Sequence, residues 1–461
     1  MHLIEEHTHP LDVPEIRTNI ASFLSRRDCT SCMRVNKAWY NDFACSVWHT
    51  IDFDENDDSF TRIPPSTLAK YGHLIREARN VVKEEQIATL RHAAINSLLR
   101  LEFNITNNLV ARALFFDVFR QNRDSLTNIE LSAHLIDTDT YSAQRQLGIF
   151  YLTIDLPDSG SNLTEIYLGS LCLTRTNFSD ILRYSPQLDR VNVFGNLFQS
   201  HDHTSEFFQH HGVKTLSAPL RQAWAPDNLL SDTPSLFVHF PRLETWLSLD
   251  HEIPDPPVKM HVLRDELAHY CPRLVNVDFD YHETNSKDVA DFLVGAFTGL
   301  ESCAFNYNDL EAISLVGILE HQETLMKVEL TVPDDATRPS KADSNPGAKN
   351  FVLLILRSCR YLEIFSAEGH QMDISAAEEH EWVCDRLREL RVRILGLETE
   401  AAIDECLDHM RVLRNLGSHV TLGECDGRNG SIGHNVCRKL LPMSKLKTVW
   451  LGTKDYYLAT Y

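Results

Sequence analysis

Three groups of side chains have the types and spacing that chemistry requires. Cys29 and Cys32 form a Cys-x-x-Cys pair, which is the spacing of half a zinc site or of a redox dithiol. Asp278 and Asp280 alternate along one predicted strand, so their carboxylates share a face, as a general acid–base pair would. The third group could bind a metal ion through converging imidazoles and comprises His201, His203, His210 and His211.

Each group also has a structural interpretation, which we favour. A zinc site needs a second ligand pair, and none lies at suitable spacing near Cys29 and Cys32. Loop histidines are common in a chain with 22 histidines, and carboxylates on an open face are usually solvated. The sequence has no glycine-rich phosphate loop and no Gly-x-Ser-x-Gly motif. We therefore predict a non-catalytic chain without metal or cofactor, with metal binding by the histidine segment as the alternative.

The first element that would position side chains is a helical segment at residues 13–53. Pro14 suits the first turn of a helix, where its missing N–H costs nothing. The side chains of Ile16, Ile20, Phe23 and Leu24 recur at helical spacing and form one apolar stripe. A segment of about 40 residues hides too little surface to cover that stripe alone. It therefore needs a second surface.

Two further short helices are expected in this segment. Asp28 is a plausible N-cap of the second helix, and Asn36 can cap the third. Residues 49–53 read as an extended exit. The other large apolar side chains are Cys32, Val35, Trp39, Phe43 and Trp48.

Downstream, the pattern Leu-x-x-Leu-x-Leu recurs with apolar substitutions, at intervals of 25 to 37 residues. Clear copies begin at Leu98, Leu126, Leu163, Leu188, Leu274, Leu300, Leu325, Leu387 and Leu446. Weaker copies begin at Val213, Leu243, Leu362 and around Gly417. Helical stretches are predicted between copies, at residues 261–270, 287–297, 351–359 and 381–387. Since one strand–helix unit cannot close a core, the units must stack into a curved α/β solenoid.

In this register the outward strand positions line the concave side of the solenoid. They include Glu130, Glu165, Tyr167, Arg190, Asn192, Phe194, Asn276, Asp278, Asp280, Asn306, Lys327, Glu329, Glu389, Arg391, Arg393 and Trp450. Aromatic and arginine side chains are typical of protein interfaces. For substrate binding we predict Tyr167, Arg190, Phe194, Asp278, Asp280, Glu329, Arg391, Arg393 and Trp450. Acidic middle repeats and basic late repeats would suit a ligand that carries both charges. An ordinary solvated face is the alternative.

The bulk composition narrows the class of protein. With 461 residues, 43% apolar, the chain is long enough for several domains or one elongated array. Its net charge of −21 argues against nucleic-acid binding, which needs clustered basic side chains. No signal-peptide pattern and no membrane-spanning run is present, so we expect no membrane association. Eleven scattered cysteines indicate reduced thiols, in the cytoplasm or nucleus. Insertions are expected at 133–160, 196–211 and 333–349, the last a mobile loop.

The N-terminal segment closely resembles the F-box. The resemblance rests on Pro-Glu-Ile, then Phe-Leu, then Cys-x-x-Val-x-Lys-x-Trp-Tyr, and finally Val-Trp-x-x-Ile-Asp-Phe. The sequence departs from the family at Val13, where Leu is usual, and at Cys29, where Leu or Ile is common. Several repeats are introduced by SPQL, FPRL, YCPRL or SCRYL, similar to the lead-in of the cysteine-containing leucine-rich repeats that often follow F-boxes. Most copies lack the Asn or Cys that normally follows Leu-x-Leu.

The resemblance implies an F-box at residues 8–55, a helical linker or first repeat at 56–95, and a leucine-rich-repeat-like solenoid at 96–461. An F-box docks on the Skp adaptor subunit and through it on cullin, so the chain would be a substrate receptor of a Skp–cullin–F-box ubiquitin ligase for an unknown protein substrate. Proximity would then supply the rate enhancement. A non-degradative scaffold is the alternative. The adaptor-binding residues implied are Val13, Pro14, Ile16, Ile20, Phe23, Leu24, Cys32, Val35, Trp39 and Trp48.

Overall fold

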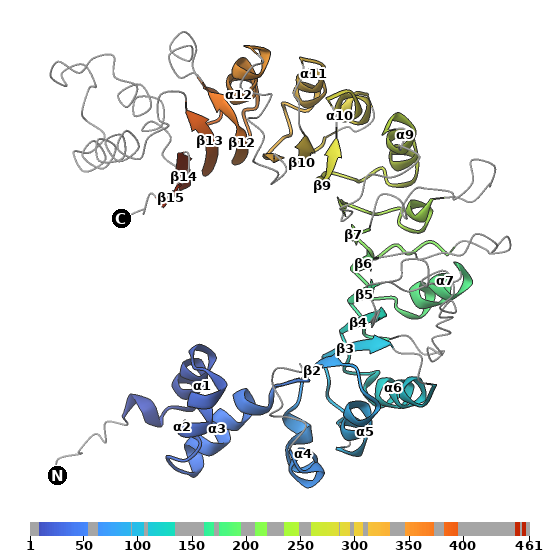
Figure 1. The fold of residues 1–461 in the computed structure, drawn as a ribbon, viewed down its shortest axis with the longest axis vertical. Coiled ribbons are helices and arrows are strands. Elements are labelled where there is room, and N and C mark those ends of the chain that lie inside the picture. The colour runs from blue at the N-terminus through green and yellow to red at the C-terminus, as the bar shows by residue number, and fades with distance from the viewer. Residues whose placement is uncertain are drawn as a thin grey trace, which may run out of the picture. The chain divides into compact units, whose positions relative to one another are not determined.

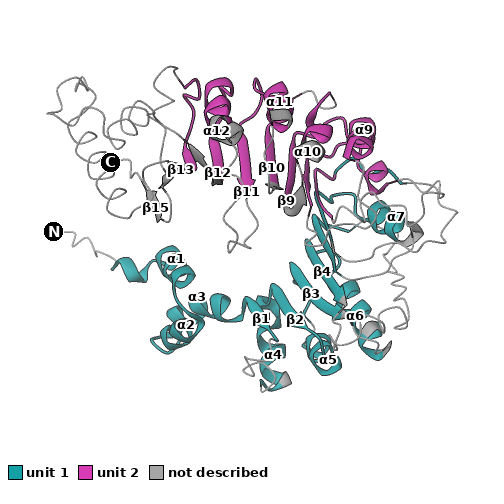
Figure 2. Cartoon of the chain, turned by 45° about the horizontal axis from the view of Figure 1, so that its top comes forward, with its two compact units in different colours: residues 1–212 teal, residues 213–461 magenta. Residues whose placement is uncertain are grey.

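The computed structural model places most of the repeats and the N-terminal helices (Figure 1). It describes residues 9–53, 63–93, 95–105, 109–133, 161–169, 175–194, 208–218, 235–248, 260–284, 286–295, 299–307, 312–331, 346–372, 382–394, 448–451 and 454–457. The chain divides into two compact units, unit 1 with residues 1–212 and unit 2 with residues 213–461 (Figure 2).

Unit 1 begins with three short helices that follow a single 3-10 turn, η1 (Pro10–Asp12). These are α1 (Pro14–Phe23), α2 (Arg26–Cys32) and α3 (Lys37–Trp48), which we call the three-helix segment. Asn36 caps α3 as expected, because its side chain accepts a hydrogen bond from the Trp39 N–H at 2.9 Å. The prediction that Asp28 caps α2 was wrong. The cap is Ser25, whose backbone is extended and whose hydroxyl oxygen accepts from the Asp28 N–H at 3.2 Å.

The rest of unit 1 alternates strands with helices. In chain order the elements are β1 (Thr50–Asp52), α4 (Pro65–Tyr71), η2 (Gly72–Leu74), β2 (Glu77–Val81), α5 (Glu84–His92), β3 (Arg100–Ile105), α6 (Leu109–Asn122), β4 (Asn128–Ala133), β5 (Glu165–Gly169), α7 (Arg175–Tyr184) and β6 (Arg190–Phe194). The strands pair in parallel in sequence order, from β1 to β6. The helices cover one face of this sheet (Figure 1).

Unit 2 has the same construction. Its elements are β7 (Thr215–Ser217), η3 (Leu236–His239), β8 (Thr245–Leu247), α9 (Met260–Tyr270), β9 (Asn276–Thr284), α10 (Ser286–Leu293), β10 (Ser302–Tyr307), α11 (Ala312–Glu320), β11 (Lys327–Thr331), α12 (Pro346–Ser358), β12 (Ile364–Met372), β13 (Glu389–Ile394), β14 (Thr448–Leu451) and β15 (Lys454–Tyr457). Strands β7 to β14 are parallel, and β15 returns antiparallel to β14.

The predicted solenoid of strand–helix units is confirmed, and the repeat pattern explains its register. A strand starts two residues after the first residue of each motif, as Arg100 follows Leu98. The next apolar position is paired between neighbouring strands, so that Leu101 lies beside Ile129 and Ile129 beside Ile166. All of these side chains are buried. Each strand–helix repeat therefore completes its core only against the next repeat.

Buried residues at the turns before the strands form hydrogen bonds within and between successive repeats. At five of the predicted motif copies the first motif residue donates its N–H to the carbonyl three residues earlier, as Leu274 does to Cys271 at 3.0 Å. The Cys271 thiol in turn donates to the Phe240 carbonyl of the preceding repeat at 3.4 Å. These lead-in residues are Ser185, Phe240, Cys271, Cys359 and Cys384, and all are buried.

Some predictions about helices and strands were wrong or incomplete, and others concern residues that the structure does not describe. Residues 382–387 form one of these lead-in turns rather than the predicted helix. In this turn the Cys384 carbonyl accepts a hydrogen bond from the Leu387 N–H. Strand β2 was not predicted. The copy around Gly417 lies outside the described residues, as do 134–160, 195–207 and 332–345, which make up most of the three expected insertions.

Candidate functional site: two protein-binding surfaces

The first candidate surface lies on the three-helix segment, where α1 separates its apolar side chains. Ile20 and Leu24 pack against a small core, whereas Ile16 and Phe23 remain 38% and 81% exposed. The predicted single stripe is therefore split between two directions. Helix geometry accounts for this, because each residue turns the side chain by about 100° and the inward direction lies nearer Ala21.

The core of the three-helix segment is complete without the exposed side chains. Its fully or nearly buried members are Ala21, Cys29, Phe43 and Val47. Trp39 stacks on Phe43 with ring centroids 5.4 Å apart. Burial raises the pKa of the Cys29 thiol, and its sulfur donates to the Ala21 carbonyl at 3.6 Å. Cys29 is thus a packing residue rather than a reactive thiol.

A buried ion pair fixes α1 against α3. The Arg17 Nε lies 2.5 Å from the Asp42 carboxylate, and Arg17 also donates to the Leu11 carbonyl at 2.7 Å. Arg17 is almost fully buried, so its charge needs both partners. The pair orients α1 so that Ile16 and Phe23 face away from the core.

The third helix is also joined to the first repeat. Trp48 stacks on Tyr71 with ring centroids 4.5 Å apart, and the Tyr40 and Tyr71 hydroxyls share a hydrogen bond. The Lys70 amine lies 5.0 Å above the Tyr71 ring. Trp48 is followed by Ile51 and Phe53 at repeat spacing, so the end of α3 is also the start of the first repeat. This aromatic joint leaves α1 and α2 uninvolved.

The structure therefore sorts the ten sequence-predicted adaptor residues. Pro14, Ile16, Phe23 and Val35 are exposed, and Val35 leaves 59% of its surface open. The half-buried ones are Val13, Ile20, Leu24, Cys32, Trp39 and Trp48. Tyr40 stands in the F-box-like motif, but neither Tyr40 nor Tyr71, which form the joint, was predicted as a site residue.

The second candidate surface is the outward strand face, which is the sheet face not covered by helices. In unit 1 its predicted residues alternate with buried ones as expected, because Tyr167 and Asn192 are half-buried beside the buried Ile166 and Val193. Glu165 accepts hydrogen bonds from Asn128 at 2.7 Å and Asn192 at 3.0 Å. Cross-strand bonds of this kind order the face before any partner binds.

In unit 2 the predicted charges are largely balanced within their own strands. Lys327 pairs with Glu329 at 2.6 Å, and the Arg391 Nε lies 2.5 Å from Glu389. Arg388 pairs with Glu363 at 3.4 Å, just before β13. These contacts reduce the difference in charge between middle and late repeats. Of some predicted residues only the strand position is described, namely Phe194, Asp280, Asn306, Arg393 and Trp450.

The histidine segment shows a structural role at the one member whose surroundings are described in detail. His210 is buried, its Nε2 is 2.9 Å from the Ser185 carbonyl, and its Nδ1 accepts from the Gly212 N–H at 3.1 Å. His201 and His203 lie outside the described residues. Within the described ranges, no group of three or more His, Cys, Asp or Glu side chains is placed to hold a metal ion.

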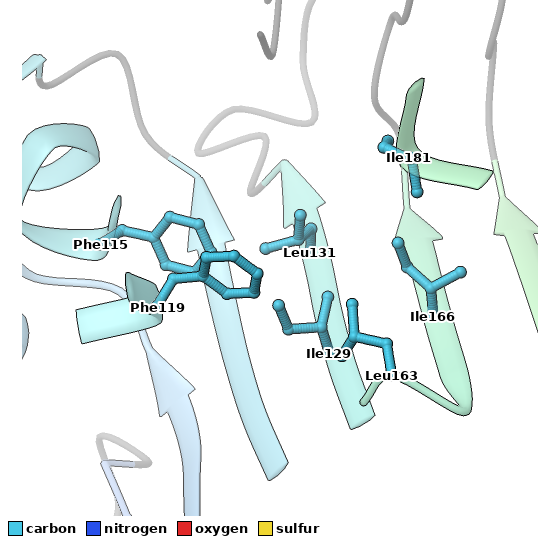
Figure 3. A pocket seen from close by; sticks show the side chains of 7 residues that line it. All are labelled: Phe115, Phe119, Ile129, Leu131, Leu163, Ile166 and Ile181. Carbon is cyan, nitrogen blue, oxygen red and sulfur yellow. The ribbon is translucent and has the colours of Figure 1, made fainter. Parts of the chain in front are cut away.

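A small pocket lies between the sheet of unit 1 and its helices (Figure 3). Phe115 and Phe119 of α6 form one side, and Ile181 of α7 lies across the strands. The other lining residues are Ile129, Leu131, Leu163 and Ile166. None of these side chains can donate or accept a hydrogen bond, so the pocket offers packing space and no chemistry.

The strand pairing defines the class of protein as an α/β solenoid of leucine-rich-repeat-like units. No protein-family model matches the sequence, and no curated protein matches it. Among the described helices, none is long and apolar enough to cross a bilayer.

Two solved structures are similar in backbone. One is a chain of the Rad7 and Elc1 complex in yeast, with a TM-score of 0.38 and 12% identity over 84% of this chain and 89% of that chain. The other is a chain of the TLR13–ssRNA13 complex, with a TM-score of 0.34 and 12% identity over 72% of this chain and 51% of that chain. At these values neither likeness carries an argument about function.

Proposed function

We propose that this protein is the substrate receptor of a Skp–cullin–F-box ubiquitin ligase. The observation that carries the proposal is the exposure of Ile16, Phe23 and Val35 on a segment whose own core is already complete. Fully burying one such side chain contributes about 1.5–3 kcal/mol. A second polypeptide that covers all three would therefore gain substantial free energy, and the F-box motif resemblance points to the Skp adaptor.

The outward strand face supplies the second half of the proposal, a surface for the client protein. Its half-buried Tyr167 is of a residue type that is enriched at interface hot spots. The chain itself breaks and forms no bond. Its role is to hold a client lysine near a charged ubiquitin-conjugating enzyme, which turns a bimolecular encounter into a nearly unimolecular one.

A pull-down with purified Skp adaptor tests the docking step. Phe23→Ala combined with Val35→Ala should weaken adaptor binding at least about tenfold, because two exposed side chains lose their burial on docking. The matched control is Val110→Ala with Val316→Ala, on α6 and α11. These valines are 53% and 54% exposed, so removing them costs similar surface elsewhere.

Equal adaptor recovery by both double variants would overturn the proposal. If the adaptor is captured but cullin is not, and the bound client is not ubiquitinated, the chain is a non-degradative scaffold. Cullin recovery and client ubiquitination in the same reconstituted sample support the ligase role.

A further inference from the structure

The outward face of the first strands carries more acid than base. At outward positions of β1 to β6 the carboxylates are Asp52, Glu77, Glu102, Glu130 and Glu165, and the guanidinium groups are Arg79, Arg100 and Arg190. Each guanidinium group already pairs with a carboxylate on this face, at 2.6 Å, 3.0 Å and 3.9 Å respectively. Three of the five carboxylates, Glu77, Glu130 and Glu165, are the partners in these pairs.

Glu102 lies at the centre of this imbalance. Its neighbour in register on β4 is Glu130, and like charges on adjacent strands repel. Among the described residues, no basic nitrogen forms an ion pair with Glu102. Burial raises the pKa of the Glu102 carboxyl, and the neighbouring Glu130 charge raises it further.

A bulge in β2 separates Arg79 from Glu102, and Arg100, whose charge lowers the Glu102 pKa in part, pairs with Glu130. The pairing of β2 with β3 shifts between Ala78 and Val81, and the bulged residue Asn80 has a φ of 53°. Arg79 turns back to Glu77 in its own strand. Asn80 instead donates its backbone N–H toward Glu102 and its side-chain amide to Asp52 at 2.8 Å. A neutral residue therefore donates hydrogen bonds to Asp52 and Glu102.

An aromatic ring borders the same carboxylates. Tyr167 is the register neighbour of Glu130 on β5 and is half-buried. Burial raises the pKa of the Tyr167 hydroxyl, and the charges of Glu130 and Glu102 raise it further. A planar guanidinium group can bond a carboxylate with its N–H fork while its face lies on an aromatic ring.

We propose that Glu102, Glu130 and Tyr167 form a docking surface for an arginine-bearing segment of a partner protein. A guanidinium group of the partner would supply the ion-pair partner that Glu102 lacks among the described residues. A bare metal ion fits less well, since the described carboxylates do not converge into a set of three ligands. The inference rests on the proposed function in one respect: the partner would be the client of the ligase.

The test is a binding titration with a fluorescein-labelled peptide that carries three arginines separated by glycine and serine, and with the same peptide in which lysines replace the arginines. Glu102→Gln with Glu130→Gln should weaken arginine-peptide binding at least about tenfold, because charge-assisted hydrogen bonds are lost. The control is Asp117→Asn with Asp180→Asn, which changes net charge equally on α6 and α7. Each of these aspartates pairs with an exposed arginine, so this control should bind within about twofold of wild type.

The role of the ring is tested separately. Tyr167→Leu should weaken arginine-peptide binding more than Tyr167→Phe, because only phenylalanine keeps an aromatic face. Equal binding of arginine and lysine peptides, or equal loss in the two double carboxylate variants, would overturn the inference. A thermal melt establishes that each variant is folded. The glutamine variants should capture the Skp adaptor normally, so failure of adaptor docking and failure of arginine binding are separate results.

Discussion

At the scale of single residues, two phenylalanines of the three-helix segment have opposite surroundings. Phe43 is fully buried, whereas Phe23 is 81% exposed. Helical spacing in the sequence identified the apolar side chains of α1 but could not tell which ones face inward. That direction depends on packing against α3, which is fixed by the Arg17–Asp42 ion pair between residues 25 positions apart.

This difference in burial predicts that substitution by alanine destabilises the fold strongly at Phe43 and only slightly at Phe23. Phe43→Ala should cost about 3–5 kcal/mol of folding free energy, because it opens a cavity in a small core. Phe23→Ala should cost less than about 0.5 kcal/mol, because its side chain is already in water. Hydrogen exchange of the α3 amides measures both. Similar acceleration of exchange in the two variants would contradict the assignment of Phe23 to the surface.

Two buried histidines predict how stability depends on pH. Burial lowers the pKa of His210 and of His321, and each imidazole contacts a carbonyl of the preceding repeat, Ser185 or Leu293. Below the unfolded pKa of about 6.5 the unfolded chain therefore binds more protons than the folded chain. The contribution to stability is full above that pH and is lost as the pH falls toward the lower folded pKa values.

Urea denaturation at neutral and at mildly acidic pH checks this expectation. The wild-type protein should lose more unfolding free energy on acidification than a variant with His210→Asn and His321→Asn, by up to about 1.4 kcal/mol per pH unit for each histidine. An equal pH dependence of the two proteins would show that these imidazoles are not held neutral.

At the scale of elements, the strands were predictable and their lead-in turns only partly so. The motif starts located every described strand from β3 to β14, because a period-two apolar pattern after a buried leucine fixes both register and face. Strand β2 was missed because the small Ala78 stands where the motif has its second leucine. The first motif position is nevertheless occupied by an apolar side chain, the buried Ile75. Glu102 follows from the register that starts at Leu98, but its lack of a cation depends on the β2 bulge, which no local pattern predicts.

The turns also contain a polar link between repeats that can be tested. The buried Asn122 amide donates to the Ile95 and Val118 carbonyls at 2.8 Å each, and its oxygen accepts from the Leu98 N–H at 2.9 Å. Asn122→Ala leaves these groups unpaired and should cost about 2–4 kcal/mol. The control Asn128→Ala loses its half-buried bonds to Glu165 and the Thr127 hydroxyl, which water can replace, and should cost less than about 1 kcal/mol. Equal losses in chemical denaturation would mean that the buried link adds no stability.

At the scale of the whole molecule, the repeat pattern determines the architecture but not the partner. Stacked strand–helix units follow from the sequence because no single unit can close a core. The sequence predicted the two candidate binding surfaces only in part. These are the α1 face with Ile16 and Phe23, and the acidic strand face around Glu102. Both depend on contacts between distant residues. The net charge of −21 is consistent with a basic client, since an acidic molecule attracts cationic segments from a distance.

The central claim is that a second polypeptide covers the exposed face of the three-helix segment, and hydroxyl-radical footprinting tests it most directly. The measurement compares oxidation of Phe23 and Val35 in the protein alone and in its mixture with the Skp adaptor, with Val110 on α6 as an internal reference. Both side chains should be oxidised readily in the free protein and should become protected several-fold with the adaptor, while Val110 stays unchanged. Phe23 and Val35 that are equally oxidised in both samples would contradict the account.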